Sequence, residues 1–155
     1  MLFRDRWILF CATGCNNGKI PVAPGTFGSL IGLLLAWCLS GWPIGWQTLF
    51  TISFCGISVW VAHKAERLIG TKDPGMIVID EIAGILIACL GVALTAASAI
   101  IIFILFRLFD VFKPFPVGWL DRHLTGGIGI VADDVAAGIL AGIVYHAGYW
   151  LTAVM

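Results

Sequence analysis

Long stretches of the chain carry no charged residue. Residues 20–63, 82–106 and 135–155 contain no Asp, Glu, Lys or Arg. A helix that crosses the hydrocarbon core of a bilayer needs ~20 apolar residues in a row, whereas a helix in a soluble core rarely needs so many. The pattern therefore predicts helices that span a membrane.

Local breaks divide these stretches into five hydrophobic segments. Pro43 and Gly45 end the first segment, residues 95–98 form a turn between the third and fourth, and Asp133 and Asp134 open the fifth. The expected segments are residues 27–42, 47–62, 77–94, 99–109 and 133 to near the C-terminus, with a polar loop over residues 110–132. We expect an all-α fold, a polytopic membrane bundle of about five hydrophobic helices, in a single domain over residues 1–155.

The charged residues all fall on one side of the membrane if the five segments alternate in direction. The nine basic residues on that side are Arg4, Arg6, Lys19, Lys64, Arg67, Lys72, Arg107, Lys113 and Arg122. Basic residues concentrate in cytoplasmic loops, so the polar loops are expected on the cytoplasmic side. All nine carboxylates lie at or inside the same boundary, which places any chemistry there.

Composition agrees with this interpretation. Hydrophobic residues make up 60% of the chain and charged residues 12%, whereas a soluble domain is about a quarter charged. The formal net charge is +0, and no basic run occurs, so nucleic acid is not an expected partner.

Two pairs of adjacent acids are the first candidates for chemistry. Asp80 and Glu81 lie one turn inside the third segment, where an unpartnered carboxylate costs a few kcal/mol, so a function is expected of them. A structural ion pair with Arg107 or Lys113 is the alternative. Asp133 and Asp134 would open the fifth segment, where the helix dipole stabilises negative charge.

Small residues point two of these acids toward the bundle interior. Gly138 and Gly142 share a helical face with Asp134, and this Gly-x-x-x-Gly spacing lets another helix backbone approach closely. Gly84 does the same for Asp80 on the third segment. We therefore expect both carboxylates to face neighbouring helices.

Cations and backbone donors complete the candidate site. Arg107, Asp110 and Lys113 recur every third residue on one helical face until Pro114 ends the helix; they form either an exposed ion-pair row or a grip for phosphate and metal. The loop that follows Lys19 contains Pro24, Gly25 and Thr26 before the first segment, where backbone N–H groups can form an anion nest or merely cap a helix. Clustered carboxylates beside phosphate-binding cations suit Mg²⁺.

Four motifs then resemble the phosphatidylglycerophosphatase A family. The motifs are Ile-Pro-Val-Ala-Pro-Gly-Thr-Phe-Gly-Ser at 20–29, Ile-Asp-Glu-Ile-Ala-Gly at 79–84, Phe-Arg-Leu-Phe-Asp-Val-Phe-Lys-Pro-Phe-Pro at 106–116 and Gly-Ile-Gly-Ile-Val-Ala-Asp-Asp-Val-Ala-Ala-Gly at 127–138. The resemblance runs from Lys19 to about Tyr145. It implies a bacterial inner-membrane, Mg²⁺-dependent phosphatase that converts phosphatidylglycerophosphate to phosphatidylglycerol at the cytoplasmic face.

Roles follow from the residues and the resemblance together. We expect a Mg²⁺ site made by Asp80, Glu81, Asp133 and Asp134, with Asp110 as a further ligand or the nucleophile. Lys113, helped by Arg107 and Lys19, would hold the phosphate, and the loop that contains Pro24, Gly25 and Thr26 would supply backbone N–H donors. The catalytic residues expected are Asp80, Asp110, Lys113 and Asp134.

Two alternatives stay open on the same residues. A CDP-alcohol phosphotransferase also gathers Asp residues at a cytoplasmic membrane face, although its Asp-Gly-x2-Ala-Arg motif is missing. A cation or proton transporter could use Asp80, Glu81 and Asp134 as a relay, but no charged residue continues the path through the outer half of any segment.

Overall fold

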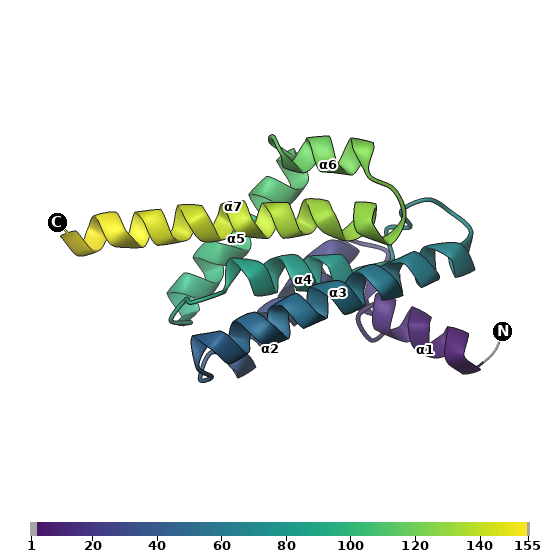
Figure 1. Ribbon diagram of the computed structural model, residues 1–155, viewed down its shortest axis with the longest axis horizontal. Coiled ribbons are helices and arrows are strands. Elements are labelled where there is room, and N and C mark those ends of the chain that lie inside the picture. The colour runs from purple at the N-terminus through teal and green to yellow at the C-terminus, as the bar shows by residue number, and fades with distance from the viewer. Residues whose placement is uncertain (1–2, 155) are drawn as a thin grey trace.

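The computed structural model describes residues 3–154 and is helical throughout, with no strand in that range. Figure 1 shows the helices gathered around one another, with both the N-terminal helix and the start of the last helix toward the same end. The elements in chain order are α1 (Phe3–Ala12), the 3-10 helix η1 (Asn17–Lys19), α2 (Pro24–Leu39), α3 (Ile44–Ile69), α4 (Ile79–Ala88), α5 (Ala96–Phe112), α6 (Val117–His123) and α7 (Gly126–Val154).

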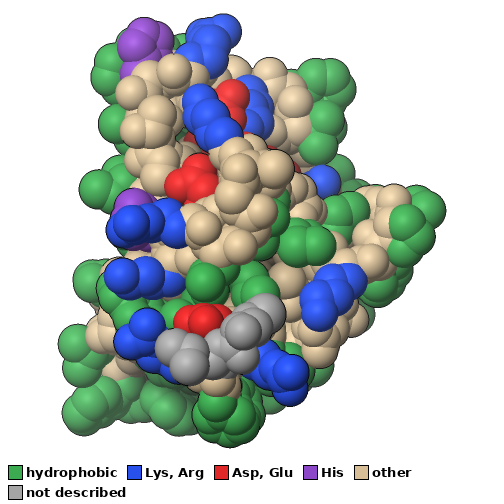
Figure 2. All heavy atoms as spheres, turned by 90° about the vertical axis from the view of Figure 1, so that its right-hand side faces the viewer, with side chains coloured by type: hydrophobic (Ala, Val, Ile, Leu, Met, Phe, Trp, Pro, Cys, Tyr) green, Lys and Arg blue, Asp and Glu red, His purple; other side chains and the backbone are tan. Residues whose placement is uncertain are grey.

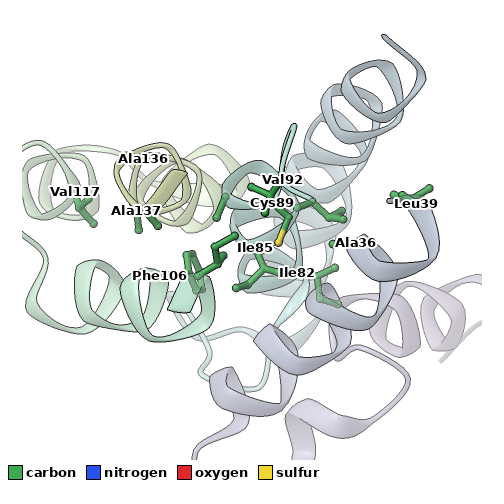
Figure 3. Packing of buried hydrophobic residues seen from close by; sticks show 14 residues of the cluster. Ala36, Leu39, Ile82, Ile85, Cys89, Val92, Phe106, Val117, Ala136 and Ala137 are labelled. Carbon is green, nitrogen blue, oxygen red and sulfur yellow. The ribbon is translucent and has the colours of Figure 1, made fainter. Parts of the chain in front are cut away.

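Helix α4 is the centre of the bundle. It packs against α2, α3, α5 and α7, and eight of its ten residues are buried. Ile85 at its middle is fully buried, as is Phe106 of α5, and both belong to one core cluster with Ala137 of α7. Figure 3 shows side chains of α2, α4, α5, α6 and α7 meeting in this cluster. The core therefore forms around the helix that carries Asp80 and Glu81.

Helix α3 is arranged with its large apolar side chains outward. Its buried residues are small or hydroxylated, including Thr51, Ser58 and Ala62, whereas Ile52 and Trp60 are more than half exposed. Small residues let membrane helices approach closely, and large apolar side chains face lipid. The pattern of α3 is the reverse of a soluble amphipathic helix and indicates membrane association.

The span count differs from the expectation. Helices occur at all five expected segments, but only α3 and residues 126–152 of α7, among the described residues, are long and apolar enough to cross a membrane. Helix α4 has ten residues, which at 1.5 Å per residue is about 15 Å, half of a hydrocarbon core. The third segment ends early because the chain turns at Cys89 and Gly91, whose φ is +71°. Five spans are therefore not confirmed.

The boundaries of the last polar loop are wrong in the sequence interpretation. Residues 110–132 are expected to be a loop, but they contain α6 and the first two turns of α7. Gly127 permits the early start of α7, since a β-carbon there would lie 2.0 Å from the carbonyl oxygen of Val59 on α3. Asp133 and Asp134 consequently lie inside α7 and do not cap it.

Charged side chains gather at one end of the bundle. Figure 2 views this end, and Lys and Arg side chains surround several carboxylates there. It is the end at which α3 finishes and α7 begins.

Candidate active site

Three carboxylates from two helices converge at the charged end. Asp80 and Glu81 lie in the first turn of α4, and Asp134 lies two turns inside α7. One oxygen from each can be chosen so that all three lie within 4.8 Å of one another. Asp80 is 7% exposed and Asp134 is 4% exposed, so the prediction that both carboxylates face the bundle interior is confirmed.

A close crossing of α4 and α7 creates this convergence. A β-carbon at Gly138 would lie 2.2 Å from the carbonyl oxygen of Gly84, and one at Gly142 would lie 3.4 Å from that of Ala88. Gly84 follows Asp80 by one helical turn, as Gly138 follows Asp134. The Gly-x-x-x-Gly packing predicted from the sequence is confirmed, and it brings the acids of the two helices together.

The buried carboxylates leave oxygens without a hydrogen-bond partner. Among the described residues, the buried side-chain oxygens in this state are Asp80 Oδ1, Glu81 Oε2, Asp133 Oδ1 and Asp134 Oδ1. A buried anionic oxygen costs several kcal/mol unless a cation or donor compensates it. Clustered hard oxygens are the donor set that Mg²⁺ prefers, so these residues fit a divalent cation.

Asp133 turns its second oxygen toward Lys113. The Lys113 Nζ donates to Asp133 Oδ2 at 2.8 Å and to Asp121 Oδ1 at 2.6 Å. Burial lowers the pKa of Lys113, but hydrogen bonds to the two carboxylates and their charges outweigh burial, so its pKa is raised and it remains a cation. Lys113 thus ties α5 to both α6 and α7.

Asp121 is a partner that the sequence interpretation missed. It lies on α6, a helix in a region expected to be loop, and it reaches Lys113 because α6 folds back on the end of α5. Lys113 itself has a φ of +44°, and a β-carbon at Gly118 would lie 2.5 Å from the Lys113 carbonyl oxygen. The one sequence feature that relates to this contact is Gly118, three residues before Asp121. Its role in the close approach to Lys113 is visible only in the folded chain.

Arg107 is a second cation near the acid cluster. Its guanidinium forms an ion pair with Asp110 at 2.5 Å, and the Asp110 carboxylate in turn lies near those of Glu81 and Asp134. The regular spacing of Arg107, Asp110 and Lys113 predicts one charged face. Two of the three do pair, whereas Lys113 leaves the helix and binds elsewhere.

The first turn of α2 covers Glu81. A β-carbon at Gly25 would lie 2.3 Å from Glu81 Oε1 and 3.1 Å from a guanidinium nitrogen of Arg107. The predicted loop of Pro24, Gly25 and Thr26 is therefore the start of a helix. The Thr26 N–H donates to the carbonyl of Ala23 at 3.0 Å, so this donor is already used.

Lys19 lies in different surroundings. It lines a groove beside α1 together with Arg6 and aromatic side chains, and the lining of that groove includes none of the acids. The sequence predicts that Lys19 helps Lys113 to hold the phosphate, because both lie on the same side of the membrane. The side of the membrane does not determine where a residue lies around the bundle, and the groove that Lys19 lines contains none of the acids.

Comparisons with known proteins agree with the motifs. A family model described as phosphatidylglycerophosphatase A matches residues 10–149. A phosphatidylglycerophosphatase A from Escherichia coli (strain K12) is 34% identical over 142 residues, which cover 89% of this chain and 81% of that protein. One from Haemophilus influenzae is 38% identical over 143 residues, which cover 90% of this chain and 88% of that protein.

A third relative carries a different name. A protein from Bacteroides thetaiotaomicron with a provisional phosphatidylinositol-3-phosphatase name is 34% identical over 147 residues, covering 90% of this chain and 91% of that protein. No solved structure matches the chain. All three relatives are named for the removal of phosphate from a phospholipid headgroup.

Proposed function

Because the chain belongs to the phosphatidylglycerophosphatase A family, we propose that it hydrolyses the terminal phosphomonoester of phosphatidylglycerophosphate, releasing phosphatidylglycerol and inorganic phosphate. The observation that supports this most is the set of buried carboxylate oxygens without partners on α4 and α7. An unpaired buried carboxylate oxygen makes folding less favourable, whereas clustered carboxylate oxygens are the ligands with which a metal-assisted phosphatase holds its cation.

Asp80, Glu81 and Asp134 would hold Mg²⁺, with Asp133 beside them. The metal would neutralise phosphoryl oxygens when bound, which makes phosphorus a better electrophile. The close crossing at Gly84 and Gly138 holds the acids in place before substrate arrives, and such preorganisation is the larger part of electrostatic catalysis.

Two cations are placed to bind the phosphate. The side chains of Arg107 and Lys113 are 23% and 32% exposed, whereas Asp80 and Asp134 are buried, so the cations lie nearer the surface than the acids. A phosphate that enters would meet guanidinium and ammonium donors before it reaches the buried carboxylates of Asp80 and Asp134. Charge-assisted hydrogen bonds to phosphate are short and strong.

The ion pair with Arg107 favours a positioning role for Asp110. A carboxylate that pairs with a guanidinium is a weaker nucleophile than a free one, and it fixes the planar donor group in one orientation.

Water would then attack phosphorus, the bond from phosphorus to the glycerol oxygen would break, and that oxygen would take a proton. The acyl chains would remain in the bilayer, so the lipid would enter sideways between helices at the charged end. By the distribution of basic residues, that end faces the cytoplasm.

Phosphate release from purified protein tests the proposal. With phosphatidylglycerophosphate in mixed micelles and Mg²⁺, we expect release of inorganic phosphate that stops on addition of chelator. Asp80→Asn and Asp134→Asn should each lower the rate by about 100-fold or more, because each removes a charged metal ligand. Glu66→Gln is the matched control, since Glu66 is an acid on α3 outside the cluster.

A metal-binding readout separates a lost site from a lost fold. Bound Mn²⁺, measured by electron paramagnetic resonance, should be retained in Glu66→Gln and lost in Asp80→Asn while both proteins elute alike from a sizing column. Wild-type rates of phosphate release in both Asp80→Asn and Asp134→Asn would show that these carboxylates are structural.

The same assay distinguishes the other chemistries. A panel that includes phosphatidylinositol 3-phosphate would show which lipid phosphate is preferred, and release of cytidine monophosphate from a CDP-lipid would indicate a phosphotransferase. Cation flux into liposomes without phosphate release would indicate a transporter.

A further inference from the structure

A groove beside α1 combines an aromatic wall with positive charge. Its volume is about 470 Å³, and Phe3, Trp7 and Phe10 line it together with Arg6, Asn16 and Lys19. The groove is open at the surface of the charged end and shares no lining residue with the acid cluster. We propose that it binds the headgroup and upper acyl region of an anionic phospholipid of the bilayer, at a second lipid site separate from the acids.

The aromatic wall has the geometry of a membrane-interface anchor. Trp7 packs edge-on against Phe3 and Phe10, with ring centroids 6.0 and 5.7 Å apart. Phe3 is nevertheless 75% exposed and Trp7 is 53% exposed. Aromatic rings left open at the end of a membrane bundle lie at headgroup depth, where one side contacts acyl chains and the other contacts water.

Charge selects the lipid headgroup. Arg6 of α1 and Lys19 of η1 come from two different elements and meet in one groove, and none of its described lining residues is acidic. Asn16 adds an amide that can donate to an ester or phosphate oxygen. Two cations and an amide around an apolar floor complement a phosphodiester with net negative charge, and a zwitterionic headgroup would bring its own cation into this positive site.

Helix geometry supplies a matched control. Arg4 is on the same short helix and is exposed, but it is two residues from Arg6 and so points to nearly the opposite side. It does not line the groove. Arg4→Gln removes the same charge from the same helix and tests whether the position of the cation matters.

The experiment uses the full chain in nanodiscs of phosphatidylcholine. Equal mole fractions of brominated phosphatidylglycerol or brominated phosphatidylcholine are added, and quenching of Trp7 is taken as the difference between wild type and Trp7→Phe. We expect phosphatidylglycerol to quench Trp7 more strongly. Arg6→Gln and Lys19→Gln should each weaken this preference on the order of fivefold, the effect of one basic residue at an anionic surface, whereas Arg4→Gln should keep it.

Three results would overturn the proposal. Equal quenching of Trp7 by the two lipids, with the Trp7→Phe signal subtracted, would show no selectivity for charge. An equal loss of the preference for phosphatidylglycerol in Arg4→Gln would show that the positive charge of α1 attracts anionic lipid without a specific site. Dimers that cover Trp7 and show no lipid preference would make a second copy of the chain the occupant. Binding is measured without turnover, so the outcome does not depend on the phosphatase activity proposed above.

Discussion

Four carboxylate oxygens without partners define the site at the scale of single residues. Asp80 and Asp134 contribute one each from the buried interior, while Lys113 compensates only the outer oxygen of Asp133. Such an arrangement is destabilising unless a cation, a proton or another donor compensates the buried charge. The same residues thus support the proposed metal site, and Lys113 compensates only part of the buried charge.

Gly25 shows how one missing side chain keeps the site open. The helical backbone at position 25 accepts alanine, but the alanine β-carbon would lie 2.3 Å from Glu81 Oε1. Glu81 would have to move, and a displacement of ~1 Å in a catalytic group can cost about 100-fold in rate. We expect Gly25→Ala to lower kcat for phosphate release by about that factor.

Gly56→Ala is the appropriate comparison for Gly25→Ala. Gly56 lies on α3, and a β-carbon there would meet no neighbouring atom within 4 Å, so alanine should leave kcat unchanged. Full activity in Gly25→Ala would show that Glu81 has room to shift and that α2 does not constrain it.

At the scale of elements, the crossing of α4 and α7 governs the site. Gly84 and Gly138 bring two backbones into contact one turn beyond the acids. Phe106 of α5 packs onto the same place, since a β-carbon on Gly84 would also lie 2.5 Å from its ring. Three helices are therefore fixed relative to one another by residues that carry no chemistry.

Gly138→Ala should separate α4 from α7. The atom that its β-carbon would meet, the Gly84 carbonyl oxygen at 2.2 Å, belongs to backbone and cannot rotate away. Overpacking of this kind costs about 1–3 kcal/mol, and the carboxylates would move apart as the helices do. We expect a lower unfolding midpoint in detergent titration and a large loss of phosphate release.

Gly148→Ala on the same helix provides the reference. No atom of the described residues lies within 4 Å of its β-carbon position, and replacement of an exposed helical glycine by alanine stabilises by about 0.5–1 kcal/mol. If both variants shifted the midpoint in the same direction, the crossing would not limit stability.

At the scale of the whole molecule, charge is separated along the bundle. Lys and Arg gather at one end (Figure 2), and large apolar side chains cover the outer surface of α3. This distribution favours an orientation in the membrane with the charged end in the cytoplasm. The acid cluster and the groove beside α1 both lie at that end, so both would meet lipid headgroups of one leaflet.

Cysteine labelling in cells tests this orientation. In a background without native cysteines, Gly41→Cys places a thiol in the exposed turn between α2 and α3, and Lys64→Cys places one at the charged end of α3. An impermeant maleimide should label position 41 in spheroplasts and position 64 only after lysis. Labelling of position 64 in intact spheroplasts would show that the charged end faces outward, opposite to the expected orientation.

The sequence by itself determined the family, and it predicted membrane association and the acids of the candidate site, whose roles stay proposals. Uncharged runs, one-sided charge and adjacent carboxylates are local properties, and they are readable because burial of an unpartnered charge in an apolar segment is costly wherever the helix lies. The motifs at 20–29, 79–84, 106–116 and 127–138 predicted the family that the comparisons confirmed.

Only the tertiary structure decided which charges meet. Hydropathy indicates the depth of a residue in the membrane but not its position around the bundle, so it does not separate Lys19, which lines another groove, from Lys113. Hydropathy also does not reveal that α4 is a short buried helix, that α7 begins before Asp133, or that Asp121 binds Lys113. These features depend on contacts between residues distant in sequence, above all the backbone approach at Gly84 and Gly138.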